Sequence, residues 1–336
     1  MAGAAIVGAA IVGAAIVGAA IVGALCALAL VAGPAGAQPA EISTDFIPVT
    51  PGPVAHTHAE AAEYADHHRG AAPADTNDFT CVPSAEHPRP VILAHGTDSN
   101  SYSDFAALAP LLAESGWCVF ALNYGLAAGD EEYGTGDIRV SAVQLGEFVD
   151  TVRASTGAEE VDLAGYSQGA TVARYYINEL GGADVVDRWV GIASPSYGGT
   201  FYGLGAAAAL LPGALDTAQA SFSEALVQQL EGSALLAEVN NPTDTVPGVR
   251  YTTIGSSVDE VIQPSGNVAL RSGDAVNHII QDLCPQNRTG HFNMVYDPFT
   301  LALVRHSLDP DRYGLGECVP VALGTEIPEM IVQSNF

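Results

Sequence analysis

Lysine is absent from this sequence, and its 11 basic residues, all of them arginine, stand against 38 aspartate and glutamate residues. The formal net charge is −27. A chain with so few positive charges repels polyanions, which excludes nucleic acid and anionic membrane surfaces as partners.

Cysteine is also scarce, with five residues in 336. Cys26 lies in an apolar leader, and the even number left in an exported chain predicts two disulfides among Cys81, Cys118, Cys284 and Cys318. Three pairings are open, of which the local ones join Cys81 to Cys118 and Cys284 to Cys318. The cysteines lack the close spacing of a zinc site, and no other cluster resembles metal ligands, so we expect no metal.

Charge is missing altogether from residues 3–31, where four Gly-Ala-Ala-Ile-Val repeats lead into a second apolar run. Ala35-Gly36-Ala37 then fits an A-x-A cleavage site, which predicts a signal peptide over residues 1–37 and a secreted protein. No basic residue precedes the run, and the run exceeds the roughly 20 residues that span a membrane. The alternative is therefore an uncleaved N-terminal membrane anchor.

Residues 38–77 are rich in proline, alanine and histidine, which predicts an extended N-terminal arm. The histidines of this arm are interpreted as solvated rather than metal-binding: His56, His58, His67 and His68. The catalytic domain is expected over residues 78–336, a length that suits one domain of the larger α/β type.

Short apolar runs alternate with helical patterns from residue 90 onward. The sequence predicts strands at residues 90–94, 118–122, 161–164, 189–193 and 251–254, and helices at residues 105–115, 138–153, 170–180 and 298–308. This alternation predicts an α/β fold with a mostly parallel central sheet and helices on both faces. In such sheets the functional site lies at the carboxyl ends of the strands.

The most informative stretch is Gly165-Tyr166-Ser167-Gln168-Gly169, which lies between a predicted strand and a predicted helix. G-x-S-x-G in that context is typical of a nucleophile elbow, a sharp turn that exposes a serine hydroxyl above the sheet. The turn is so tight that little larger than glycine fits at Gly165 and Gly169. Ser167 is therefore the candidate nucleophile, and a glycine-rich turn that happens to hold a serine is the alternative.

A serine nucleophile needs a base, and the base needs an acid that fixes its tautomer. Asp259 follows the last predicted strand by a few residues and is the candidate acid, whereas its neighbour Glu260 is expected to point elsewhere. His291 is the candidate base, because it lies in a polar loop after the acid. His278 is interpreted as a core or edge residue, and His306 as a solvated residue on a helix.

The tetrahedral oxyanion of acyl transfer needs hydrogen-bond donors. One should be the backbone N–H of Gln168, directly after the nucleophile. The second should come from Thr97 after the first strand, where Gly96 allows close approach and the Thr97 hydroxyl could add a third donor.

These motifs carry a resemblance to a known family. The stretches concerned are His95-Gly96-Thr97, residues 165–169, Ala193-Ser194-Pro195, residues 259–264, and residues 281–285 followed by His291. The chain resembles the secreted triacylglycerol lipases and esterases of actinobacteria in the α/β-hydrolase superfamily, and more distantly the yeast enzyme called lipase B. The resemblance spans about Cys81 to Cys318.

The resemblance implies hydrolysis of acylglycerols or other carboxylic esters without a cofactor and without a stable partner protein. It also implies both local disulfides. It assigns the nucleophile to Ser167, the acid to Asp259, the base to His291, and the oxyanion donors to Thr97 and Gln168. Rival functions are an esterase or cutinase-like hydrolase of soluble esters or polyesters, an acyl transferase, and an inactive secreted binding protein.

Residues 198–245 separate two predicted strands and are expected to form a helical cap insertion. Their apolar residues and several glycines predict a mobile cover and a preference for water-insoluble esters at a lipid–water interface. The alternative is that these helices pack on the sheet as ordinary core.

Overall fold

The computed structural model describes residues 46–199 and 223–326. All of these residues belong to one compact unit, Ile42–Phe336. The predicted signal peptide, the start of the predicted arm, and residues 200–222 of the predicted cap lie outside the described residues.

A six-stranded sheet forms the centre of this unit, in the order β4-β3-β5-β6-β7-β8. Every neighbouring pair of strands is parallel. The strands are β3 (Val91–Ala94), β4 (Val119–Leu122), β5 (Val161–Tyr166), β6 (Val186–Ile192), β7 (Arg250–Gly255) and β8 (Val276–Ile279). The predicted strands are confirmed with small shifts at their ends, and β8 at the sheet edge accounts for His278.

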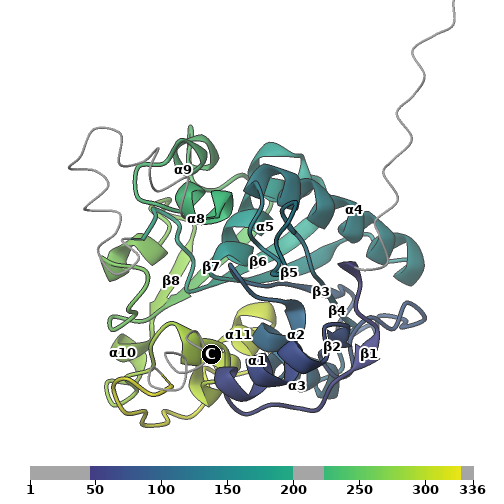
Figure 1. Cartoon of the computed structure of the whole chain (residues 1–336), viewed down its shortest axis with the longest axis horizontal. Helices are drawn as coiled ribbons and strands as arrows, with labels where there is room; N and C mark the ends of the chain where they lie inside the picture. The colour runs from purple at the N-terminus through teal and green to yellow at the C-terminus, as the bar shows by residue number, and fades with distance from the viewer. Residues whose placement is uncertain (1–45, 200–222, 327–336) are drawn as a thin grey trace, which may run out of the picture. The chain divides into compact units, whose positions relative to one another are not determined.

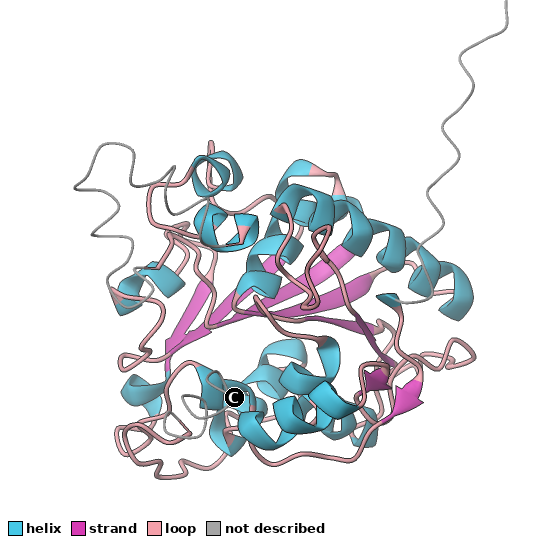
Figure 2. Ribbon diagram, in the orientation of Figure 1, coloured by secondary structure: helices cyan, strands magenta, loops and turns pink. Residues whose placement is uncertain are grey.

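Helices cover both faces of the sheet (Figures 1 and 2). One face carries α4 (Ile138–Thr156), α5 (Gln168–Glu179), α8 (Glu224–Gln228) and α9 (Ala234–Val239). The other carries α1 (His58–His67), α2 (Ser101–Phe105), α3 (Leu108–Glu114), α10 (Ile280–Leu283) and α11 (Pro298–Leu308). Side chains along β3 alternate accordingly, since Val91 and Leu93 join one core and Ile92 joins the other. Because both faces are buried, the strands are apolar throughout.

The helix predicted at residues 105–115 is two short helices, α2 and α3. The first begins at residue 101 because Asn100 caps it: the Asn100 side chain accepts the Ser103 N–H, and Ser103 returns a bond to the Asn100 backbone. The predicted helices at residues 138–153, 170–180 and 298–308 correspond to α4, α5 and α11.

The prediction of an extended arm is wrong for residues 46–77. β1 (Thr50–Pro51) pairs with β2 (Ala71–Ala72), and α1 lies between them in the chain and packs against α2. Ala61 and Ala65 are buried on α1, and their small side chains allow this close packing. The segment therefore belongs to the same folded unit as the sheet, and this unit begins well before Asp78.

The last helix of the predicted cap, α9, packs as core. Leu235, Leu236 and Val239 of α9 are buried in the core that α4 and α5 share. The buried guanidinium of Arg174 on α5 donates to Asn240 just after α9. For α9 the alternative interpretation is thus the one observed, whereas Val227 and Leu230 belong to a separate apolar cluster with Val261 and Ile262. The apolar stretch of residues 200–222 lies outside the described residues.

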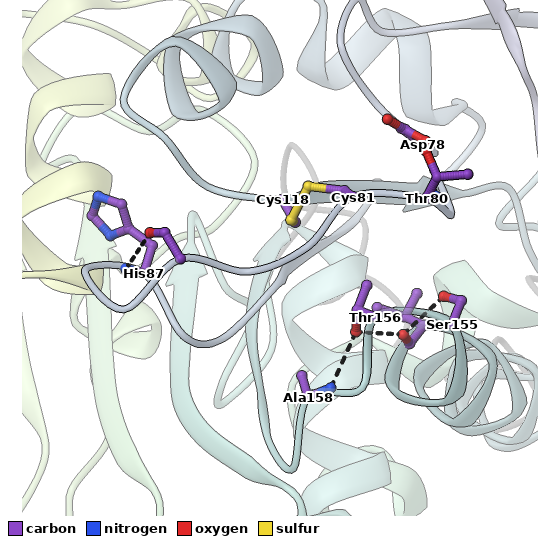
Figure 3. Close-up of a disulfide and its surroundings, with 10 residues drawn as sticks. Asp78, Thr80, Cys81, His87, Cys118, Ser155, Thr156 and Ala158 are labelled. Atoms are coloured by element: carbon purple, nitrogen blue, oxygen red, sulfur yellow. Dashed lines mark hydrogen bonds between the residues drawn. A yellow bond between two sulfur atoms is a disulfide. The ribbon is translucent and has the colours of Figure 1, made fainter.

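Both local disulfides form, with Cα–Cα distances of 5.9 Å for Cys81–Cys118 and 5.2 Å for Cys284–Cys318. Figure 3 shows that the first joins the segment before β3 to the residue that precedes β4. Within residues 46–199 and 223–326, no helix is long and apolar enough to cross a membrane.

Candidate active site

Ser167 lies at the turn between β5 and α5, as the G-x-S-x-G motif predicts. Its φ of 51° and ψ of −119° are unusual for a residue with a side chain, and its N–H donates to the Ile192 carbonyl at 2.8 Å. The flanking glycines leave no room for a Cβ. At Gly165 it would lie 2.4 Å from the Ala170 nitrogen, and at Gly169 it would lie 1.9 Å from the Ala94 carbonyl oxygen.

The three predicted triad residues meet in one line of hydrogen bonds. His291 Nε2 lies 3.1 Å from Ser167 Oγ, and His291 Nδ1 lies 2.9 Å from Asp259 Oδ2. Asp259 and His291 are 1% and 3% exposed, so water competes little for these bonds. A carboxylate can only accept, so Nδ1 carries the proton and Nε2 is left to accept from the Ser167 hydroxyl.

The loop after β7 holds the Asp259 carboxylate through two backbone hydrogen bonds. Its second oxygen, Oδ1, accepts the backbone N–H groups of Val261 at 2.8 Å and Ile262 at 2.7 Å. Burial alone lowers the pKa of His291, but Asp259, and more weakly Glu260, outweigh it and raise that pKa above its usual value.

Glu260 does not point away from the site, contrary to the prediction. Its Oε2 accepts the backbone N–H of His291 at 2.9 Å. A Cβ at Gly290 would lie 2.3 Å from the same oxygen, so the glycine is what lets the carboxylate reach this backbone. Glu260 thus holds the backbone of His291, while Asp259 holds its ring.

The other two histidines are separate from this site. His278 is half-buried on the edge strand β8. His306 is half-buried on α11, where its Nδ1 lies 2.6 Å from the Tyr313 carbonyl oxygen, so the prediction of a solvated side chain is wrong for it.

Thr97 follows β3 and lies beside the turn that carries Ser167. Its Oγ1 accepts side-chain N–H bonds from Gln168 and from Gln229, each at 2.9 Å. A hydroxyl that accepts two bonds keeps its own hydrogen for a third direction. The sequence predicts a role only for the backbone N–H of Gln168 and gives no signal for its side chain. It also gives no signal for Gln229, which lies in the predicted cap, 132 residues from Thr97.

The loop that carries Thr97 rests on buried polar side chains. Asp104 on α2 accepts the Gly96 N–H at 2.7 Å, and His95 Nδ1 lies 2.8 Å from the Gly96 carbonyl oxygen. His95 Nε2 accepts the Tyr124 N–H at 3.2 Å, which requires a neutral ring. Burial accordingly lowers the pKa of His95 to about 4.

The histidine pairs of the N-terminal segment differ from their prediction in one respect. His56, His67 and His68 are exposed, but His58 is buried and bonds to Asp104. Within the described ranges, no group of three or more His, Cys, Asp or Glu residues could hold a metal ion.

Comparison with known proteins identifies the family. Residues 88–301, well over half of the chain, match the family model described as lipase (class 2). Aspergillus fumigatus lipase B is similar in structure, with a TM-score of 0.58 and 20% identity over 75% of this chain and 61% of that one. The propeptide form of the Bacillus licheniformis lipase BlEst2 gives a TM-score of 0.51 and 16% identity, over 72% of this chain and 54% of that one.

This chain therefore spans about three fifths of the length of the Aspergillus enzyme and about half of the Bacillus one. At these identities the two structures establish the fold alone, which is the α/β-hydrolase fold. The chain belongs to the class 2 lipase family.

Proposed function

We propose that this protein is a secreted serine hydrolase that cleaves carboxylic esters through an acyl-enzyme on Ser167. The observation that supports it most is the unbroken line from Asp259 through His291 to Ser167, with bonds of 2.9 Å and 3.1 Å. An inactive binding protein on this scaffold would have no need for such a line.

In the first half of the reaction, His291 Nε2 accepts the Ser167 proton while Ser167 Oγ attacks the ester carbonyl carbon. The resulting imidazolium is stabilised by the Asp259 carboxylate. It then gives its proton to the departing alkoxide, and the C–O bond to the alcohol breaks. In the second half, water loses a proton to His291 and attacks the acyl carbon. The bond between that carbon and Ser167 Oγ then breaks, and His291 returns the proton to Oγ as the acid leaves.

The oxyanion formed in each half needs donors that are already in place. Gln168 is the first residue of α5, so its N–H belongs to those that a helix leaves without an acceptor inside the helix. We assign the other donors to the N–H and hydroxyl of Thr97. The bonds from Gln168 and Gln229 to the Thr97 oxygen orient that hydroxyl.

Acylglycerols are the substrate class that family membership favours. The main alternative is an esterase or cutinase-like enzyme for soluble esters or polyesters. The two are separated by hydrolysis rates across p-nitrophenyl esters from acetate to palmitate, with an emulsified medium-chain triglyceride alongside. A jump in rate when droplets form supports the lipase, whereas smooth saturation with a preference for acetate supports the esterase.

Secretion is supported by the two disulfides, which persist in oxidising compartments, and by the leader over residues 1–37 with its A-x-A site. N-terminal sequencing of the protein from culture medium tests it. A mature chain that begins at Gln38 is expected, and a chain that stays in the membrane fraction with its leader would contradict secretion.

The nucleophile is tested by Ser167→Ala together with a fluorophosphonate probe. We expect loss of hydrolysis by several powers of ten and loss of labelling, because the serine supplies the covalent step. Ser194→Ala is the matched control. Ser194 is also a buried serine after a strand, but its Oγ is hydrogen-bonded to Ser196 at 3.0 Å rather than to His291. Full activity in Ser167→Ala would refute the proposal.

A further inference from the structure

We propose that His58, on the N-terminal helix α1, is a positioning residue for the oxyanion loop (residues 95–99) and acts through Asp104. The inference rests on the proposed function of Ser167 and Thr97. His58 lies before residues 88–301, the span that matches the lipase family, and in a stretch whose composition resembles a solvated arm.

The first step is the contact between the two side chains. His58 Nε2 lies 3.1 Å from Asp104 Oδ1, and the two residues are 7% and 0% exposed. Figure 1 shows α1 and α2, the helices that carry them, side by side beneath the sheet. Neither residue belongs to the Ser167–His291–Asp259 line, so the pair is a buried acid–base contact that the hydrolytic steps do not use.

The second step leads from Asp104 to the oxyanion loop. Asp104 Oδ2 accepts the Gly96 N–H at 2.7 Å, and Asp104 Oδ1 accepts the Ser99 hydroxyl at 2.8 Å. These two residues bracket Thr97 and Asp98, and Asp98 has a φ of 50°. One carboxylate therefore holds both ends of the turn that presents Thr97.

The third step is the reason that Asp104 needs His58. A fully buried carboxylate is costly unless hydrogen bonds and a partner of opposite polarity offset its lost hydration. Burial raises the pKa of Asp104, but the hydrogen bond and charge of His58 and the Gly96 N–H outweigh it and hold that pKa below its usual value. Without His58 the carboxyl group would turn toward another donor or take up a proton, and its hold on Gly96 would weaken.

The position of His58 also connects the oxyanion loop to the segment after the base. Its ring centre lies 6.1 Å from that of Phe292 and 6.1 Å from that of Tyr296. Phe292 follows His291 directly and begins the short helix Phe292–Val295, and Tyr296 comes just after that helix. α1 thus contacts both α2, which holds the oxyanion loop through Asp104, and the short helix that follows His291.

The geometry matters because an oxyanion donor acts only when it lies within about 2.7–3.1 Å of the developing charge. A shift of the Thr97 turn would weaken binding of the transition state and leave binding of the ground-state ester nearly unchanged. His58 touches no substrate atom and is therefore a positioning residue rather than a catalytic one.

The experiment compares His58→Leu, which removes the donor but keeps a similar volume, with His58→Gln, whose amide can still donate to Asp104. His67→Leu is the matched control, since His67 is on the same helix but exposed. Active sites are counted with the fluorophosphonate probe. We then measure kcat per active site and KM for p-nitrophenyl butyrate. We also measure the affinity for a trifluoromethyl ketone, which forms a tetrahedral oxyanion adduct.

We expect His58→Leu to lower kcat and the affinity for the ketone in parallel, by about 10- to 100-fold, with KM changed less than about threefold. His58→Gln should recover most of both losses, and His67→Leu should match the wild type. Unchanged kcat and ketone affinity per active site in His58→Leu would overturn the proposal, even if the melting temperature falls.

If His58→Leu does not fold, Asp104→Asn gives the same test, because it keeps the side-chain shape and one acceptor oxygen. A wild-type kcat in Asp104→Asn would then overturn the proposal. Failure of the proposed function looks different. In that case the wild-type enzyme itself would show no labelling of Ser167.

Discussion

Replacing Asp259 by asparagine keeps the shape of the side chain and removes one acceptor oxygen. Asp259 Oδ1 accepts from two backbone N–H groups, those of Val261 and Ile262, whereas Oδ2 faces His291 Nδ1. The single oxygen of asparagine will therefore face the backbone, and its NH₂ group will face the imidazole. His291 must then present an unprotonated Nδ1, which moves the proton to Nε2 and removes the acceptor that Ser167 needs.

The expected loss is about 10⁴-fold in kcat at neutral pH, which corresponds to about 5.4 kcal/mol of transition-state stabilisation. Glu260→Gln is the matched control, because glutamine keeps an oxygen that can accept the His291 backbone N–H. Its loss should stay below about tenfold. The assay is kcat and kcat/KM for p-nitrophenyl butyrate between pH 6 and 9, normalised to correctly folded protein by circular dichroism.

Two results would refute this reasoning. Activity of Asp259→Asn within tenfold of the wild type would mean that the tautomer of His291 is set by something else. Alternatively, Glu260→Gln could be the inactive variant, which would place the triad acid one residue further along the chain.

The pH profile of kcat/KM should fall on the acid side, because protonated His291 cannot accept the serine proton. The inflection of this profile should lie above the ordinary histidine pKa of 6.5, since Asp259 raises the pKa of His291. An inflection well below 6 would contradict the pairing with Asp259. Gly169→Ala should prevent soluble expression or lower the melting temperature sharply, because the new Cβ would lie 1.9 Å from a carbonyl oxygen of β3. Gly70→Ala is the control and should match the wild type, because a Cβ there would have no neighbour within 4 Å. Peptide mapping without reduction should find Cys284 linked to Cys318, and replacing both by alanine should lower the unfolding free energy in urea by about 3 kcal/mol; free thiols in the mature protein would argue against the bridge.

Local sequence patterns were enough to predict the parts of the site that local structure determines. The elbow at Ser167 follows from two glycines between a strand and a helix, and the order of Asp259 and His291 follows from the topology of the sheet. Ser167 lies where β5 ends and Asp259 lies a few residues past the end of β7, so the run of residues around each contains the information, whereas His291 lies in the loop after α10.

The contacts that the sequence did not reveal depend on distant parts of the chain. His58 meets Asp104 across 46 residues, and its polar, alanine-rich neighbourhood is typical of a solvated segment. A local signal for α1 did exist: Thr57 stands three residues before Glu60, the spacing of a helix N-terminus, and the Thr57 side chain does accept the Glu60 N–H. It predicts the helix but not the burial of His58, which depends on packing against α2.

Glu260 illustrates the same limit at closer range. Adjacent residues in a loop need not diverge, and here both carboxylates turn toward His291, one to its ring and one to its backbone. Only the path of residues 287–291 decides this, because Gly290 brings the backbone within reach.

The central claim, an acyl-enzyme on Ser167, is tested most directly by mass spectrometry of the intact enzyme after acid quenching during turnover of a p-nitrophenyl ester. The account predicts a mass increase of one acyl group, located by proteolysis on the peptide that contains Ser167, and a burst of one p-nitrophenol per active site. Both should be absent in Ser167→Ala. Rapid hydrolysis with an adduct on another residue, or an adduct that persists in Ser167→Ala, would contradict it.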